Sequence, residues 1–150
     1  LRKAGIQVWY EFPDYVTPIK VDRTVTDGET INVAGIRIRA IHTPGHTPGC
    51  LSFLVGTEEG RTALTGDLLG SNGNPGWAGS EGFSAAATLA SVKKLCRFRP
   101  ARAFWGHGSV PGDALAWLKD SVAREKAGLW KIDATPHPNA KPPAWMRRRD

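Results

Sequence analysis

The sequence predicts an α+β or layered αβ domain, in which two helices cover one side of a mostly antiparallel sheet. Short β-rich runs separated by turn signals fill the chain up to residue 65, whereas helical periodicity begins only after residue 82. One more strand-like run, residues 101–105, lies between two helix-like segments. A run of strands followed by helix, strand and helix is typical of a sheet that carries its helices on one side.

The predicted strands are rich in β-branched and aromatic residues and end at turn residues. They are residues 6–10, 19–25, 30–33, 36–41, 51–55, 62–65 and 101–105. The run 36–41 alternates between apolar and polar residues, which predicts one face against a core and the other in water. Residues 70–82 are rich in glycine, and we expect a long loop there instead of a packed element.

Two helices are expected in the second half of the chain. Ser84 is suited to cap the first, and Pro100 ends it. Pro111 and Asp113 open the second, which closes near Gly128. The expected apolar stripes are Leu89, Val92 and Cys96 in the first helix and Leu115, Leu118 and Val122 in the second.

The size and composition of the chain indicate one globular domain. It has 150 residues, of which 41% are hydrophobic and 23% charged. We expect the domain to span residues 1–130 and to be followed by a proline- and arginine-rich tail, residues 131–150, that is extended or disordered. The formal net charge is +6, and half of this excess belongs to the tail.

Composition also disfavours several classes of protein. No apolar run approaches the roughly 18 residues of a membrane span, and no secretory signal is visible, so we expect a cytoplasmic protein without a membrane partner. The basic residues are scattered instead of clustered with aromatics, which argues against nucleic acid as a partner. Cys50 and Cys96 do not make a disulfide scaffold and are expected to be buried thiols.

Three short motifs at the ends of predicted strands contain side chains that bind metal ions. Their sequences are TPGHTPG at residues 43–49, TGD at residues 65–67 and GHG at residues 106–108. A rigid strand end next to a glycine-rich loop holds a side chain while it leaves access to it. Each motif alone has an ordinary structural explanation, because single histidines are mostly structural and a Gly-Asp pair is usually a turn. Together, two imidazoles and a carboxylate form a plausible ligand set for Zn²⁺ or a similar metal.

In this order, the three motifs resemble the last three metal-binding motifs of the metallo-β-lactamase superfamily. The separations between His46, Asp67 and His107 suit that family, and so does the glycine-rich loop after Asp67. The resemblance covers residues 1–128 and implies the C-terminal part of a metallo-β-lactamase-like αββα sandwich. It implies that His46 binds a first metal, that Asp67 bridges two metals and that His107 binds the second. The metal it implies is zinc, with iron and manganese as alternatives.

The sequence departs from the family in one large respect. The signature His-x-His-x-Asp-His, which supplies the remaining ligands, is absent from a chain that has only four histidines. We therefore expect a domain that is incomplete at its N-terminus and that binds metal weakly or not at all in isolation. Hydrolysis then depends on ligands supplied from outside this chain.

Four further side chains are relevant to the site or to the core beside it. His42 is a candidate for a hydrogen bond that supports the 43–49 loop, with a purely structural role favoured. Trp77 either lines a substrate pocket or pins the loop after Asp67. Trp105 and Trp117 are expected in the core.

Three functional hypotheses follow. The first is a metal-dependent hydrolase of a small-molecule ester, thioester, amide or phosphoester. The second is a non-catalytic, truncated relic of the fold that acts as an oligomerising scaffold. In either case we expect a homo-oligomer, or a partner segment, to cover an open sheet. The apolar residues expected on that sheet are Ile36, Ile38, Ile41, Leu51, Phe53 and Val55. A nucleic-acid-processing role draws only on the positive charge and is the weakest hypothesis.

Overall fold

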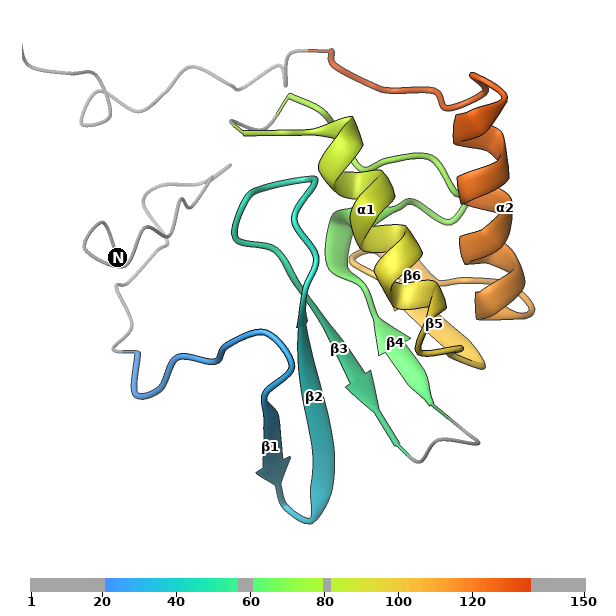
Figure 1. Cartoon of the computed structure of the whole chain (residues 1–150). Helices are drawn as coiled ribbons and strands as arrows, with labels where there is room; N and C mark the ends of the chain where they lie inside the picture. Colours follow the sequence, from blue (N-terminus) through green and yellow to red (C-terminus); the bar gives the residue numbers. More distant parts are fainter. Residues whose placement is uncertain (1–20, 57–60, 80–81, 136–150) are drawn as a thin grey trace, which may run out of the picture. The chain divides into compact units, whose positions relative to one another are not determined.

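The computed structural model describes residues 21–56, 61–79 and 82–135. The chain divides into two compact units, and the larger one, Val25–Ala134, contains all helices and strands of the described residues (Figure 1). The predicted strand at residues 6–10 and the tail beyond residue 135 lie outside the described residues. The prediction of a strand at residues 19–25 is wrong for its described part, because residues 21–25 form no strand.

In the described part of the chain, six strands form a sheet whose order follows the sequence. They are β1 (Thr30–Val33), β2 (Ile36–His42), β3 (Leu51–Val55), β4 (Thr62–Leu64), β5 (Arg102–Trp105) and β6 (Gly108–Ser109). Neighbouring strands are antiparallel except β4 and β5, which run parallel. Parallel neighbours require a crossover connection, which here includes a helix. Strand β6 was not predicted, because two residues carry no periodic signal.

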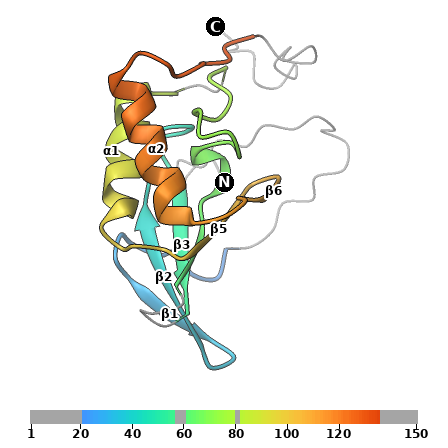
Figure 2. The ribbon, with the colours of Figure 1, turned by 90° about the vertical axis from the view of Figure 1, so that its right-hand side faces the viewer.

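Helices α1 (Ala85–Cys96) and α2 (Ala114–Lys126) lie on the same side of the sheet (Figure 2). The Ser84 hydroxyl caps α1 by accepting a hydrogen bond from the Ala87 amide at 3.2 Å. Asp113 caps α2 in the same way, with the Ala116 amide at 2.6 Å. Both predicted caps are therefore present, and the layered αβ arrangement with helices on one side is confirmed.

The core fills the space between the helices and this side of the sheet. Its main side chains are Ile41, Leu54, Ala63 and Ala103 from the sheet and Val92, Leu95, Trp117 and Leu118 from the helices. Trp117 is buried as expected, while Trp105 is half-buried and packs against the core. Cys50 and Cys96 are free thiols and only half-buried, and this partial burial raises the pKa of the Cys96 thiol.

The apolar stripe predicted for α1 is displaced around the helix. Val92 is fully buried, but Leu89 is only half-buried, and Leu95 is fully buried in place of Cys96. The reason is that Thr88 and Ser91 also face inward, where they contact the loop that precedes β3. A pattern built on apolar residues alone cannot include these two polar positions.

The opposite side of the sheet, here called the far face, carries apolar side chains that are partly exposed. Cross-strand pairing aligns Ala40, Phe53, Leu64 and Phe104, so these four residues share a side. Leu64 is 40% exposed and Phe104 is 45% exposed. The far face is completed by Ile36, Ile38, Leu51 and Val55.

The alternation predicted for β2 holds only in part. Ala40 and its neighbour Ile41 are both buried, and Ile36 is 52% exposed. Ile41 pairs with Ser52 and belongs to the helix-covered core instead of the far face. No helix in the described residues combines the length and the apolar character needed to cross a membrane.

The glycine-rich loop after Asp67 is a packed segment, which corrects the prediction of an unpacked loop. Asn74 is only 8% exposed, and its side-chain oxygen accepts hydrogen bonds from Arg124 and from the Lys131 amide. The Ser121 hydroxyl on α2 donates to the Gly73 carbonyl at 2.7 Å. The Ala78 amide donates to the Asp133 carbonyl, so hydrogen bonds continue past residue 130, where the tail was expected to begin.

Candidate functional site

The sheet topology brings the three sequence motifs to one edge. Strands β2 and β4 are both antiparallel to β3 and therefore run in the same direction, and β5 is parallel to β4. The C-terminal ends of β2, β4 and β5 consequently lie on the same edge of the sheet, called here the site edge. His46 follows β2, Asp67 lies in the short 3-10 helix η3 (Gly66–Leu68) after β4, and His107 lies between β5 and β6.

The His46 ring is oriented by the loop that follows Asp67. Its Nδ1 lies 2.9 Å from the Trp77 carbonyl oxygen. A carbonyl can only accept a hydrogen bond, so Nδ1 of His46 is the donor. Backbone carbonyls orient metal-binding histidines in this way. This contact comes from the main chain of Trp77 and not from its indole, so both roles considered for the Trp77 side chain stay predictions.

Asp67 and His107 form a close pair at the site edge. Nε2 of His107 lies 3.4 Å from Oδ1 of Asp67, which is within ion-pair range but is not a hydrogen bond by geometry. Within the described residues, this buried Oδ1 has no hydrogen-bond donor. A buried carboxylate oxygen without a donor is costly unless something else supplies positive charge. The His107 ring is further supported by Trp105, whose ring centroid lies 5.0 Å away in an edge-on arrangement.

Two glycines make room for this arrangement. A Cβ atom at Gly106 would lie 2.0 Å from Asp67 Oδ1, so any side chain there would displace the carboxylate. A Cβ atom at Gly76 would lie 2.0 Å from the Asp67 carbonyl oxygen and 3.4 Å from His46 Nδ1. Gly76 therefore marks the place where the His46 ring and the Asp67 backbone meet.

The residues present fit part of a metal site. The Asp67 oxygen without a hydrogen-bond donor, the adjacent His107 nitrogen and the oriented ring of His46 are features that a divalent cation would use. Among residues 21–56, 61–79 and 82–135, however, no three His, Cys, Asp or Glu side chains are grouped closely enough to hold an ion. The assignment of His46, Asp67 and His107 as metal ligands therefore stays a prediction. The geometry pairs Asp67 with His107 and places the His46 ring near the backbone of Asp67.

The loop that carries His46 is fixed against α1. The Ser91 hydroxyl donates to the Pro44 carbonyl at 2.7 Å, and the Ser84 amide donates to the Gly45 carbonyl at 2.9 Å. A Cβ atom at Gly45 would lie 2.3 Å from the Thr88 hydroxyl oxygen, so the loop backbone touches the helix directly. Thr88 and Ser91 were not among the predicted site residues, although their helical spacing could have indicated a polar stripe facing the loop.

His42 connects the same loop to the turn before β1. Its Nε2 donates to the Pro48 carbonyl at 2.8 Å, which is the loop hydrogen bond considered for it. Its amide donates to Asp27 Oδ1, and Lys94 Nζ bridges Asp27 and the His42 carbonyl. The hydrogen bond from Lys94 holds the pKa of the Asp27 carboxyl below its usual range, with help from the His42 amide. No sequence pattern indicates the Asp27–Lys94 pair, because its members are far apart in the chain.

A layered αβ domain whose strand ends present two histidines and an aspartate has the form of a metallo-hydrolase. The chain belongs to the metallo-beta-lactamase superfamily, whose model matches residues 2–107. It is 32% identical over 113 residues to a probable metallo-hydrolase of Burkholderia pseudomallei, covering 69% of this chain and 38% of that protein. It is 33% identical over 99 residues to an atrochrysone carboxyl ACP thioesterase of Aspergillus fumigatus, covering 65% of this chain and 21% of that protein.

Solved structures show the same fold. The crystal structure of a metallo-beta-lactamase family protein from Thermus thermophilus superimposes with a TM-score of 0.60 at 28% identity, covering 73% of this chain and 37% of that one. The six-stranded mixed sheet with its two helices is thus a metallo-beta-lactamase-like αβ fold. The chain spans between about a fifth and two fifths of the length of these relatives.

Proposed function

We propose that this chain is the C-terminal part of a metal-dependent hydrolase, with a thioester as the first candidate substrate. The observation that carries the proposal is the buried Asp67 Oδ1, which faces His107 at the site edge without a hydrogen-bond donor in the described residues. Family membership supports hydrolysis as the reaction class. The thioesterase name of one relative favours a thioester over the ester, amide and phosphoester alternatives.

In this proposal each site residue has a distinct task. A bound divalent metal ion would lower the pKa of a water molecule and polarise the carbonyl of the substrate. Asp67 would bind the metal through a carboxylate oxygen and His107 through a ring nitrogen. Trp105 supports the His107 ring. His46 would bind the metal through Nε2, because its Nδ1 donates to the Trp77 carbonyl. His42 acts only indirectly, by holding the backbone of the His46 loop at Pro48.

This chain alone supplies too few protein ligands to complete either metal position. Zn²⁺ sites commonly have three or four protein ligands, and the His-x-His-x-Asp-His segment is not in the sequence. We therefore propose weak zinc binding by the isolated chain, with iron or manganese as alternatives. Activity would require the missing ligands from a longer protein or from a partner.

Calorimetric titration of the whole chain with Zn²⁺ tests the metal site. Asp67→Asn and His107→Gln should each weaken zinc binding about tenfold or more, because each removes one donor from an already incomplete site. Asp120→Asn on the exposed side of α2 is the matched control and should leave zinc affinity nearly unchanged. Tight stoichiometric binding of two ions would contradict the incomplete ligand set. Equal affinity of Asp67→Asn and the unmodified chain would contradict the role of Asp67.

The catalytic part of the proposal has a separate test. The chain should show little hydrolysis of reporter thioesters, esters and phosphoesters in the presence of Zn²⁺. Reading the coding frame upstream of Leu1 should reveal a His-x-His-x-Asp-His segment, and the longer protein should hydrolyse a thioester in a chelator-sensitive way. Chelator-sensitive turnover by the 150-residue chain alone would show that the present residues suffice.

The second candidate function is a non-catalytic scaffold that associates through the far face. Its supporting observation is the partly exposed apolar surface of Ile36, Leu64 and Phe104. Burying several such side chains would favour association, at roughly 1.5–3 kcal/mol for each one fully buried. Light scattering on the purified chain should show a dimer or larger species that Leu64→Lys dissociates. A monodisperse monomer would exclude the scaffold, whereas an oligomer that never hydrolyses, even in its longest natural form, would favour it over the hydrolase.

A further inference from the structure

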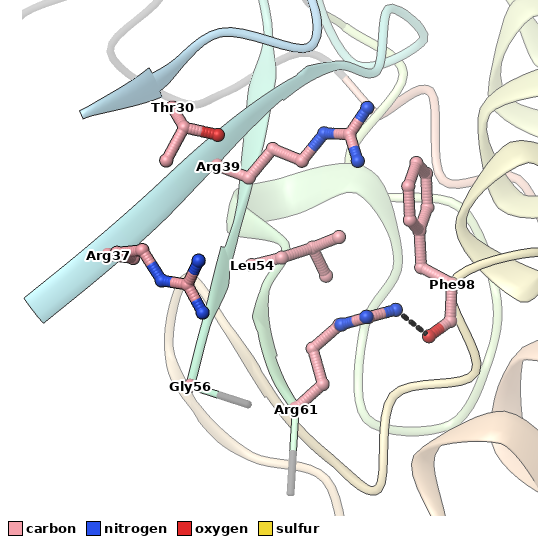
Figure 3. Close-up of a pocket in the computed structure, with 7 residues that line it drawn as sticks. All are labelled: Thr30, Arg37, Arg39, Leu54, Gly56, Arg61 and Phe98. Atoms are coloured by element: carbon pink, nitrogen blue, oxygen red, sulfur yellow. Dashed lines mark hydrogen bonds between the residues drawn. The ribbon is translucent and has the colours of Figure 1, made fainter. Parts of the chain in front are cut away.

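We propose that a second site, separate from the site edge, binds the phosphate group of a phosphorylated small molecule. The site is a cavity of about 180 Å³, called here the arginine pocket. It is lined by Thr30, Arg37, Arg39, Leu54, Gly56, Arg61 and Phe98 (Figure 3). This inference does not depend on the proposed hydrolase activity, because the two sites share no residue.

Strand register explains why three arginines gather in this pocket. Arg37 and Arg39 are two residues apart on β2 and therefore project from the same side of the sheet. Arg39 pairs with Leu54, whose side chain belongs to the helix-covered core. Arg61 directly precedes β4, at the end of the sheet opposite to the site edge. Helix α1 ends at Cys96, and Phe98 in the turn that follows lines the pocket.

Phe98 holds two of the arginines in place. The Arg39 guanidinium lies over the Phe98 ring, with Cζ at 5.2 Å from the ring centroid. Arg61 Nη1 donates a hydrogen bond to the Phe98 carbonyl at 2.6 Å. Arg39 on β2 and Arg61 just before β4 both extend toward Phe98, with Leu54 between them (Figure 3). Held side chains lose less conformational entropy when they bind a ligand.

The chemistry of the pocket favours a phosphate group. A guanidinium offers a planar fork of N–H donors that matches phosphate oxygens, and several forks can surround one tetrahedral anion. A dianion would neutralise part of the positive charge that Arg37 and Arg39 bring to this cavity. The Thr30 side chain adds a hydroxyl to the lining. Buried Leu54, only 4% exposed, forms an apolar floor that weakens competition from water.

Calorimetric titration with inorganic phosphate, at constant ionic strength and with a chelator present, tests the proposal directly. The unmodified chain should bind phosphate saturably. Arg37→Gln should weaken this binding about tenfold, because it removes a charge-assisted donor from an exposed side chain. Arg102→Gln is the matched control. Arg102 is also an exposed arginine of the sheet, but it lies on β5 and does not line the pocket. This variant should change phosphate affinity less than twofold.

Two further measurements identify the source of the phosphate and test whether each variant is still folded. Glycerol 3-phosphate should compete with inorganic phosphate if a phosphomonoester is the ligand. Thermal unfolding of each variant establishes that loss of binding is not loss of folding. The proposal is overturned if phosphate does not saturate the chain, if Arg37→Gln binds as the unmodified chain does, or if Arg102→Gln loses as much affinity. In that last case the effect would be general charge screening.

Discussion

The two faces of the sheet are built from similar residues but are covered very differently. On the helix side, Leu54 and Ala63 are almost completely buried beneath α1 and α2. On the far face, Leu64 and Phe104 occupy adjacent strands and keep about two fifths of their surface exposed. This difference shows that the described residues complete one layer of packing only. The stability of this chain should therefore depend mainly on the helix side.

The largest expected difference between the faces comes from a matched pair of substitutions. Leu54→Ala should lower the free energy of unfolding by about 2–5 kcal/mol, because it opens a cavity in the core. Leu64→Ala removes the same atoms from the far face, where Leu64 is already 40% exposed, and should cost about 1 kcal/mol or less. Urea denaturation measures both values. Equal losses would mean that the far face is covered in solution, and the Leu64→Ala cost would then depend on protein concentration.

A second, intermediate effect concerns the edge at which the strands present the site. Gly106→Ala would place a methyl group 2.0 Å from Asp67 Oδ1 and must displace the carboxylate. We expect a loss of about 1–3 kcal/mol in stability together with weaker zinc binding. Gly49→Ala is the control, because a Cβ atom there meets no other atom within 4 Å. If Gly106→Ala kept both properties, the close packing of Asp67 against this backbone would be wrong.

The smallest effect is expected at the turn before β1, where Asp27 joins Lys94 and the His42 amide. Because the folded pKa of Asp27 is lowered, its contribution to stability is present above the carboxyl's ordinary pKa near 4 and is lost as pH falls through the folded value. Asp27→Asn should cost about 0.2–1 kcal/mol at neutral pH, since the pair is largely exposed. The cost should disappear in strong acid.

Denaturation at several pH values checks the Asp27 prediction, with Asp120→Asn on the exposed side of α2 as the control. The control should change stability little at any of these pH values. A cost at Asp27 that persists unchanged in acid would assign the effect to lost hydrogen-bond geometry and not to charge.

Much of this architecture could be predicted from the sequence, for definable reasons. Ser84 and Asp113 indicate where their helices begin, because capping is a local property of one side chain and the next turn of backbone. The strand-end positions of His46, Asp67 and His107 followed from motifs and their order. What could not be predicted depends on partners far along the chain. Ser91 with Pro44 and Ser121 with Gly73 are contacts of this kind, and the second helps to turn an expected open loop into a packed one.

The parallel pairing of β4 with β5 has a consequence for how the molecule forms. The Thr65 hydroxyl and the Phe104 carbonyl that it contacts are 39 positions apart, whereas β1, β2 and β3 pair through short connections. Closing a long loop costs entropy before its contacts are made, and such pairings slow folding. We therefore expect the β1–β3 meander to gain amide protection early and β5 to gain it late in pulse-labelled hydrogen exchange. Asp67 and His107 come together only in that late step, so the chemistry of the site edge would be assembled last.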